Sequence, residues 1–359
     1  MSKRNNDEPE SLRLGEWLQG TGPDSDIAVC TRVRLARNVK EFRFAPKLEQ
    51  RESEDLNSFL LKQFQDLRLD EKLDEKLTVL DVNSLDELER QLLMERHLIS
   101  RDHATAQRPR SVAINENESI AVMINEEDHI RAQVFQSGFQ LEEAFARAER
   151  LDEAIMQRVP LAFSEEFGFL TSCPTNAGTG LRVSVMLHLP GLVWADEMEK
   201  ATDTAQKIHL AVRGLYGEGS RALGGFYQVS NQVTLGRSEQ QILDDVSKAV
   251  GRLVEWERGV RQALLQGESE IRTLDRIHRA LGLLERARIL TSEEALNCLS
   301  AVRFGVQQGQ LDQPDIAKLN RALLLCQPAH LQRIARQRLS PEERDRWRAD
   351  FLRKVLGRD

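Results

Sequence analysis

The chain lacks paired cysteines and long hydrophobic runs. Its four cysteines are far apart and form no Cys-x-x-Cys pair, which argues against a zinc ribbon and against a disulfide framework. No run of about 18 apolar residues occurs, and the first residues are polar. We therefore expect neither a membrane span nor a secretory signal, and we predict a cytoplasmic protein with free thiols.

Two phosphate-binding loops are missing as well. The sequence has no Gly-x-x-x-x-Gly-Lys-Ser/Thr loop, and no Gly-x-Gly-x-x-Gly follows a candidate strand. Neither a P-loop nor a dinucleotide-binding fold can therefore explain the segments that combine arginine with glycine.

Charge is distributed unevenly along the chain. The net charge is −7, yet residues 256–359 carry 19 Lys and Arg against 14 Asp and Glu. Of these cations 17 are arginine, which favours bidentate binding of phosphate or carboxylate. A solvated helix surface would have the same composition, so both interpretations stay open.

Hydrophobic periodicity predicts an α+β fold, with a large, mainly antiparallel sheet flanked by helices and followed by an all-α C-terminal domain. The predicted strands are 26–35, 77–82, 110–115, 119–125, 129–136, 167–173, 181–189 and 225–236. The predicted helices are 50–66, 85–98, 140–158, 196–213 and 238–265.

The strand pattern ends after residue 265, and amphipathic helices follow. Thr291 and Ser340 each begin a capping box, the second with Pro341 at the first helical position. The predicted parts are a polar N-terminal segment (1–24), a domain that contains the sheet (25–258) and a helical C-terminal domain (259–359).

The segment from Cys173 to Arg182 places a thiol, a glycine-rich turn and an arginine close together. Pro174 and the glycines exclude a helix and let backbone N–H groups approach a ligand, while Arg182 offers a planar fork to phosphate oxygens. These features suit phosphate chemistry. A cysteine beside such a loop is also commonly a packed residue at a strand end, so the segment alone is ambiguous.

Two other segments carry charge in patterns that suit anion chemistry. Strand alternation in Cys30–Asn38 puts Arg32 and Arg34 on one face, where a bound anion, or acidic partners, would offset their repulsion. Asn125–Arg131 is a predicted turn between two strands that carries three acids and a base. A solvated turn would be the plainer explanation of that segment.

Assembled in this order, the segments resemble the signatures of the phosphagen (guanidino) kinases. The matching segments are Cys30–Arg34, Asn125–Arg131, Cys173–Arg182 and Arg213. The sequence Arg344-Asp345-x-x-Arg348-Ala349 further resembles a motif of the bacterial protein-arginine kinases, a branch of this family that phosphorylates arginine side chains of proteins. The resemblance covers nearly the whole chain and implies that 25–258 is the catalytic domain.

The resemblance implies where ATP binds. In the family, arginines from separate strands and loops hold the phosphates, a histidine lies beside the base, and Mg²⁺ bridges phosphates and waters with few direct protein ligands. The implied ATP-binding residues are Cys30, Thr31, Arg32, Val33, Arg34, His97, Arg131, Arg182, Val183, Ser184, Val185, Met186, Arg213, Gly214, Leu215, Tyr216, Gly217 and Glu218. Cys30 replaces the usual serine, and Met186 stands where many relatives have histidine.

The resemblance also implies the catalytic groups. A guanidinium has a pKa above about 12 and is a poor nucleophile until carboxylates orient and deprotonate it. Glu127 matches the catalytic glutamate of the family, and Glu218 is the expected second carboxylate. Cys173 matches the reactive cysteine, whose thiolate would contact the guanidinium, and transfer is expected to be direct and in line.

Substrate and partners follow from the same resemblance. Relatives that act on small guanidino compounds have a helical domain and a closing loop ahead of the first arginine motif, which begins here at residue 30. We therefore expect an open site that admits an arginine of a polypeptide. A stress-gene repressor, a zinc-binding activator protein and a Clp ATPase/protease are the implied partners, with no membrane or nucleic acid.

The C-terminal motif has a separate interpretation. Arg344, Asp345, Arg348 and Ala349 are implied to form an allosteric site for phosphoarginine, associated with a homodimer contact; a salt-bridged surface helix is the alternative. Three functions thus stay open: a protein-arginine kinase, a small-molecule guanidino kinase, and a non-enzymatic phosphoarginine-binding module.

Overall fold

The computed structural model describes residues 13–65, 67, 76–105, 107–214 and 223–357. Within these residues an eight-stranded antiparallel sheet has the order β2-β3-β4-β5-β1-β8-β10-β9. The strands are β1 (Ala28–Arg37), β2 (Leu77–Asp81), β3 (Ser111–Asn115), β4 (Ile120–Ile124), β5 (Ile130–Ser137), β8 (Leu181–His188), β9 (Leu210–Gly214) and β10 (Phe226–Asn231). The predicted fold class, a large antiparallel sheet with helices, is confirmed.

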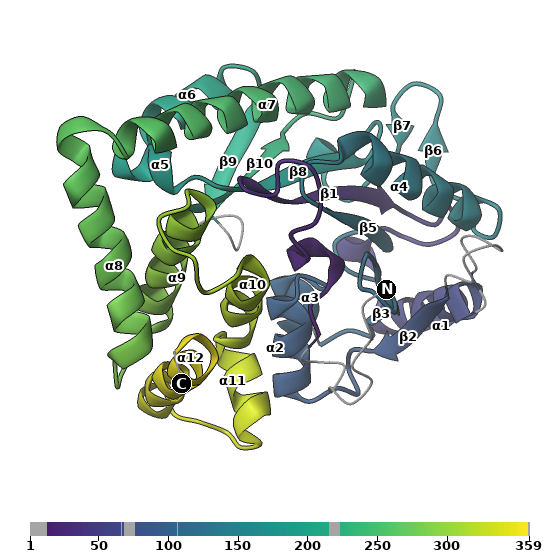
Figure 1. Cartoon of the computed structure of the whole chain (residues 1–359). Coiled ribbons are helices and arrows are strands. Elements are labelled where there is room, and N and C mark those ends of the chain that lie inside the picture. Colours follow the sequence, from purple (N-terminus) through teal and green to yellow (C-terminus); the bar gives the residue numbers. More distant parts are fainter. Residues whose placement is uncertain (1–12, 66, 68–75, 106, 215–222, 358–359) are drawn as a thin grey trace.

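The two faces of the sheet differ because strand residues alternate between them. Val33 of β1 points into the larger hydrophobic core, which α4 (Leu141–Met156) and α7 (Glu239–Leu264) cover on one side of the sheet (Figure 1). The neighbouring Arg32 and Arg34 point to the opposite face, so the alternation of β1 separates packing residues from charged ones.

Five other helices of the described residues belong to the sheet-containing part. They are α1 (Gln50–Gln65), α2 (Glu87–Glu95), α3 (Arg101–Thr105), α5 (Pro190–Trp194) and α6 (Met198–Gln206). A capping box starts α2, in which Asp86 accepts a hydrogen bond from the N–H of Glu89. Among the helices within the described ranges, none is both long and apolar enough to cross a bilayer.

Three predicted elements are wrong in extent. The helix predicted for 196–213 ends at Gln206, and Leu210–Gly214 forms an edge strand that pairs with β10. The run 167–173 is a strand only at β7 (Gly168–Phe169), which pairs with β6 (Phe163–Ser164) in a separate hairpin. The strand predicted for 225–236 ends at Asn231. In each case the partner strand, rather than local hydrophobicity, sets the limits.

In the described residues after α7 the elements are helical, as predicted. They are α8 (Glu270–Arg286), α9 (Ser292–Gln307), α10 (Ile316–Leu325), α11 (Pro328–Ala335) and α12 (Pro341–Leu356), with a short 3₁₀ helix at Gly267–Ser269. Thr291 caps α9, and Ser340 forms a reciprocal capping box with Glu343 at α12. The division predicted between residues 258 and 259 lies inside α7.

The C-terminal helices pack on the face of the sheet that carries the arginines. Phe135 and Met186 of the sheet share a hydrophobic core with α9 and α10. Beside this core, the buried carboxylate of Glu95 in α2 accepts backbone N–H groups of Ala329 and His330 at 2.7 and 3.1 Å, and lies 2.7 Å from Nδ1 of His330. These bonds hold α11 against α2 (Figure 1).

Candidate active site

A cleft of about 780 Å³ opens on the arginine-bearing face of the sheet. Strands, the end of α2 and two loops contribute to it. Its lining includes Arg32, Arg34, Arg131, Arg182 and Arg213, together with His97, Glu126, Glu127 and Cys173. The structure therefore brings three predicted groups into one cavity. They are the five arginines expected to hold the phosphates, called the arginine clamp from here on, the predicted catalytic residue Glu127, and the predicted reactive residue Cys173.

Strand pairing sets the spacing of the arginines. Arg34 of β1 lies directly opposite Arg182 of β8, so their side chains leave the sheet about 5 Å apart. Arg32 donates from Nη2 to Oε1 of Gln228 at 2.7 Å. In the described part of the chain, Nε of Arg34 is buried without a hydrogen-bond partner. Donors arranged in this way suit a multiply charged anion.

Electrostatics lead to the same conclusion. Desolvation, followed by the proximity of Arg131 and Arg182, lowers the pKa of Arg32 to about 10. Desolvation and the neighbouring arginines also lower the pKa of Arg34. A triphosphate in the cleft would offset both effects, because opposite charge favours the protonated guanidinium.

The turn between β4 and β5 holds two glutamates in different surroundings. Glu126 is buried and accepts from Nη1 of Arg131 at 2.7 Å and from Oγ of Ser100 at 2.6 Å. Burial alone would raise the pKa of Glu126, but Arg131 and these hydrogen bonds lower it to about 2. The side chain of Glu127 is 42% exposed, lies 3.5 Å from Arg131, and has a pKa raised by burial. Of the two glutamates, Glu127 is the one whose carboxylate is open to the cleft.

The other residues of this turn attach it to the Cys173 loop. Oδ1 of Asp128 accepts from Nδ2 of Asn38 and from the N–H of Ser172, both at 2.7 Å. The N–H of His129 donates to Oδ1 of Asn38 at 2.9 Å. Because Asp128 and His129 are buried, the alternative of a solvated turn is wrong for this segment.

The loop itself presents a half-buried thiol. Sγ of Cys173 lies 2.9 Å from Oγ1 of Thr175, and Oγ1 of Thr171 donates to the carbonyl of Cys173 at 2.7 Å. Pro174–Asn176 form one turn of 3₁₀ helix, so the prediction that this loop excludes any helix is wrong; proline is tolerated at its first position. Gly178 has a φ of 97°, which a residue with a side chain would rarely adopt.

The remaining predicted ATP-binding residues that the structure describes are not part of the cleft lining. Val33, Val183 and Val185 point into the core on the opposite face, where Thr31 donates to the carbonyl of Gly138 at 2.8 Å. Cys30, Ser184 and Met186 line a small hollow beside the cleft, next to Arg32 and His97. Gly214 ends β9, whereas Leu215, Tyr216, Gly217 and Glu218 lie outside the described residues.

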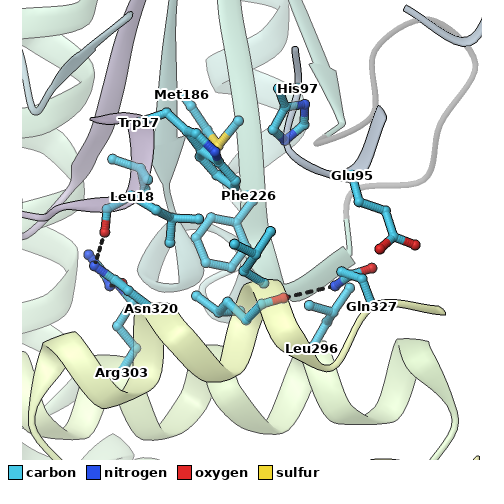
Figure 2. Close-up of a pocket in the computed structure, with 13 residues that line it drawn as sticks. Trp17, Leu18, Glu95, His97, Met186, Phe226, Leu296, Arg303, Asn320 and Gln327 are labelled. Carbon is cyan, nitrogen blue, oxygen red and sulfur yellow. Dashed lines mark hydrogen bonds between the residues drawn. The ribbon is translucent and has the colours of Figure 1, made fainter. Parts of the chain in front are cut away.

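His97 lines the cleft and also lines a second hollow, together with Trp17 and Phe226. Its ring packs edge to face against Trp17 at 4.6 Å, and burial together with Arg32 lowers its pKa to about 3, so the imidazole is neutral. Figure 2 shows His97 and Met186 at the top of this hollow, with Phe226 below them. Its volume is about 30 Å³, roughly the space of one water.

The C-terminal motif is more buried than its sequence predicts. The side chain of Arg348 is 1% exposed, and its guanidinium donates to carbonyl groups at the end of α10 and in the loop before α9, and to Asp345 at 2.6 Å. Ala349 is buried in the core, and Arg344 and Asp345 are partly exposed. Of the two arginines of the motif, only Arg344 is therefore partly exposed.

Sequence reasoning missed several residues that position the site. Asn38, Ser100, Asp128 and Gln228 bond to the predicted groups or to the loops that carry them. The available signal was a polar side chain at a cleft-facing strand position, as for Gln228. The bonds of Asn38 and Ser100 depend on segments distant in sequence and leave no local pattern.

Sequence comparison finds two matching families. The family described as "ATP:guanido phosphotransferase, C-terminal catalytic domain" matches residues 60–260, and the one described as "Protein-arginine kinase McsB C-terminal domain" matches residues 270–358. A protein-arginine kinase of Halothermothrix orenii is 40% identical over 344 residues, 96% of this chain and 97% of that protein. One from Bacillus cereus strain AH187 is 42% identical over 343 residues, 96% of each chain.

Solved structures match a large part of the chain. A duplicated taurocyamine kinase from Schistosoma mansoni, with bound components of a transition-state analogue, has a TM-score of 0.60 and 27% identity, and the match covers 70% of this chain and 35% of that one. Lombricine kinase has a TM-score of 0.59 and 23% identity over 70% of this chain and 71% of that one. The second likeness concerns the fold alone.

Proposed function

Because the chain belongs to the ATP:guanido phosphotransferase family, we propose that it transfers the γ-phosphoryl group of ATP to arginine side chains of proteins. The C-terminal region supports a protein acceptor, since it matches the C-terminal domain of protein-arginine kinases. The observation that carries the proposal is the single cleft that holds the arginine clamp together with Glu127 and Cys173.

On the donor side, the clamp binds the triphosphate and stabilises the charge of the moving phosphoryl group. Arg34 and Arg182, paired across two strands, would bracket phosphate oxygens. Their rigid attachment to the sheet limits the reorganisation needed as charge develops. Within the described residues no group of three or more His, Cys, Asp and Glu is arranged to hold a metal ion. As the family resemblance implies, magnesium would bridge phosphate oxygens and water, and it would neutralise part of their charge.

On the acceptor side, Glu127 binds and deprotonates the guanidinium. Its carboxylate can accept two N–H groups of an arginine side chain and take a proton as the N–P bond forms and the bond to the β-phosphate oxygen breaks. The Cys173 thiol, on the loop that Asp128 ties to the same turn, would contact the other side of the guanidinium. Glu218 is the proposed second carboxylate and lies outside the described residues.

The test supplies ATP, Mg²⁺ and an unfolded arginine-containing protein, and measures acid-labile phosphoarginine by ³¹P NMR. We expect phosphoarginine with the wild type and a loss of at least about 10²-fold in rate with Glu127→Ala. Phosphorylation of serine alone would contradict the proposal. Turnover with free arginine and none with protein would favour a small-molecule kinase. A binding module would be favoured if the wild type shows no turnover but binds phosphoproteins, and if Glu127→Ala leaves that binding unchanged.

The cellular setting is proposed on the resemblance alone. We place the protein in the cytoplasm as a homodimer that marks proteins for a Clp ATPase/protease, with a stress-gene repressor among its substrates and a zinc-binding activator. For the proposed phosphoarginine site, Arg344 offers a partly exposed guanidinium and Arg348 holds the adjacent loop. The site would be supported if added phosphoarginine activates the wild type but not the Arg344→Ala variant. Equal activation of the wild type and the variant would contradict it.

A further inference from the structure

Four large hydrophobic side chains are exposed on two segments that contact the Cys173 loop. Phe163 and Phe167, in the β6–β7 hairpin, are 58% and 48% exposed, and Val233 and Leu235, in the segment after β10, are 43% and 49% exposed. We call these four residues the apolar rim. Exposed apolar groups that cluster near a site commonly mark an interaction surface.

The hairpin is joined directly to the loop that carries Cys173. The N–H of Phe169 donates to the carbonyl of Gly178 at 2.8 Å, and the N–H of Gly178 returns a bond to the carbonyl of Phe169 at 3.2 Å. Phe163 packs edge to face on Phe169 at 5.3 Å. The guanidinium of the buried Arg37 lies 3.6 Å from the centre of the Phe169 ring. The hairpin is therefore positioned relative to the thiol.

The second part of the rim is joined to the same loop. Oγ1 of Thr234, between Val233 and Leu235, lies 2.9 Å from the carbonyl oxygen of Thr175 and 2.6 Å from that of Ala177. Thr234 is buried, so its two neighbours in the chain point outward. Both halves of the rim thus flank the segment that presents Cys173 to the cleft.

Charge indicates what the rim binds. The tip of the hairpin carries Glu165 and Glu166, both exposed, between Phe163 and Phe167. A surface that combines aromatic and aliphatic groups with two carboxylates complements a polypeptide that carries basic and apolar side chains. Apolar side chains of folded proteins are mostly buried, so segments that offer them are those exposed by unfolding.

We propose that the apolar rim holds the acceptor polypeptide on either side of the target arginine and selects arginines with apolar neighbours in unfolded segments. This inference rests on the proposed protein-arginine kinase activity. Because an extended chain advances about 3.3 Å per residue, side chains a few positions from the arginine can reach the rim while the guanidinium meets Glu127.

The test compares two peptides with one central arginine, one flanked by glycine and serine and one by leucine and phenylalanine. For the wild type we expect kcat/KM to be about 10- to 100-fold higher with the apolar peptide, the range expected for partial burial of two large side chains. Phe163→Ser/Phe167→Ser should remove this preference through KM, and leave the KM for ATP and turnover of the glycine-serine peptide unchanged.

Two further variants make the test specific. Val233→Ser/Leu235→Ser changes the other half of the rim and should also remove the apolar preference. It provides the test if the first variant folds poorly. Ile271→Ser/Ile289→Ser removes side chains that are 71% and 59% exposed in or next to α8, and it should leave the preference intact.

The outcomes separate the two proposals. If the wild type phosphorylates both peptides and the rim variants retain the apolar preference, the rim proposal fails and the kinase proposal stands. If the wild type phosphorylates neither peptide nor an unfolded protein, both proposals fail. A change from dimer to monomer in the rim variants, measured by light scattering and with unchanged peptide preference, would assign the surface to a second copy of the chain and overturn the proposal.

Discussion

Glu126 and Glu127 are neighbours in the chain, yet their surroundings give them different chemistry. Glu126 is held between Arg131 and Ser100 and stays ionised, because its pKa is lowered to about 2. Glu127 projects into the cleft with a pKa raised by burial. One residue thus positions the clamp and the other is suited to accept a proton, a division that environment creates between identical side chains.

This division predicts a pH dependence. Protonated Glu127 cannot accept the guanidinium proton, so kcat/KM should fall as pH decreases through its raised pKa, which lies above the ordinary value of 4.5. Glu126 would not contribute, since it titrates near 2. A profile of kcat/KM from about pH 4 to pH 8 checks this. A rate that is level down to pH 4 would contradict Glu127 as the base.

Two substitutions of Arg34 in the arginine clamp should lower kcat/KM by different amounts. Arg34→Ala should lower kcat/KM by about 10²-fold or more, because a preorganised charge on the phosphoryl group is lost. Arg34→Lys should recover only part of the activity, since lysine lacks the planar fork. Steady-state kinetics with varied ATP measure both. As a control, the exposed Arg279→Ala in α8 should behave as wild type.

The Cys173 loop depends on elements that lie far from it in sequence. Arg37, at the end of β1, forms a buried ion pair with Asp152 of α4 at 2.7 Å. The same guanidinium donates to the carbonyl of Thr179 at 2.9 Å and covers the ring of Phe169. Strand, helix, hairpin and the Cys173 loop therefore meet at one side chain.

Removing the acidic partner of Arg37 should lower the stability of the fold. Asp152→Ala leaves Arg37 buried and unpaired, so the free energy of unfolding should fall by about 3–5 kcal/mol. The matched control Glu49→Ala breaks the exposed pair with Arg43 and should cost less than about 1 kcal/mol. Urea unfolding measures both. Equal losses for the two variants would show that the Arg37 pair has no special role.

The helical C-terminal region contacts the sheet-containing part at Glu95. Its carboxylate, in α2, satisfies the first N–H groups of α11, and α2 ends next to His97 in the cleft. The helical C-terminal region is therefore joined to the His97 side of the candidate site by hydrogen bonds as well as by apolar packing.

Glu95→Ala tests this connection. We expect the free energy of unfolding to fall by about 2–5 kcal/mol, because the N–H groups of Ala329 and His330 lose a buried charged acceptor. The two parts should then unfold in separate calorimetric transitions rather than together. Glu87→Ala, an exposed position in the same helix, should cost less than about 1 kcal/mol. A single unshifted transition for Glu95→Ala would contradict the proposed coupling.

The sequence by itself determined the features that depend on local order. Alternation in β1 placed Arg32 and Arg34 on one face, and the run of antiparallel strands followed by helices predicted the fold class. These features were predictable because strand periodicity and capping depend on residues near one another in the chain.

Only the tertiary structure decided which side chains have partners far away in the chain. It converted the end of a predicted helix into the edge strand β9, because β10 pairs with it. It buried Arg348 against carbonyl groups of two other segments, and it turned Glu127 toward the cleft while Glu126 and Asp128 turned inward. Such choices depend on packing and on hydrogen bonds across the fold, which no local pattern records.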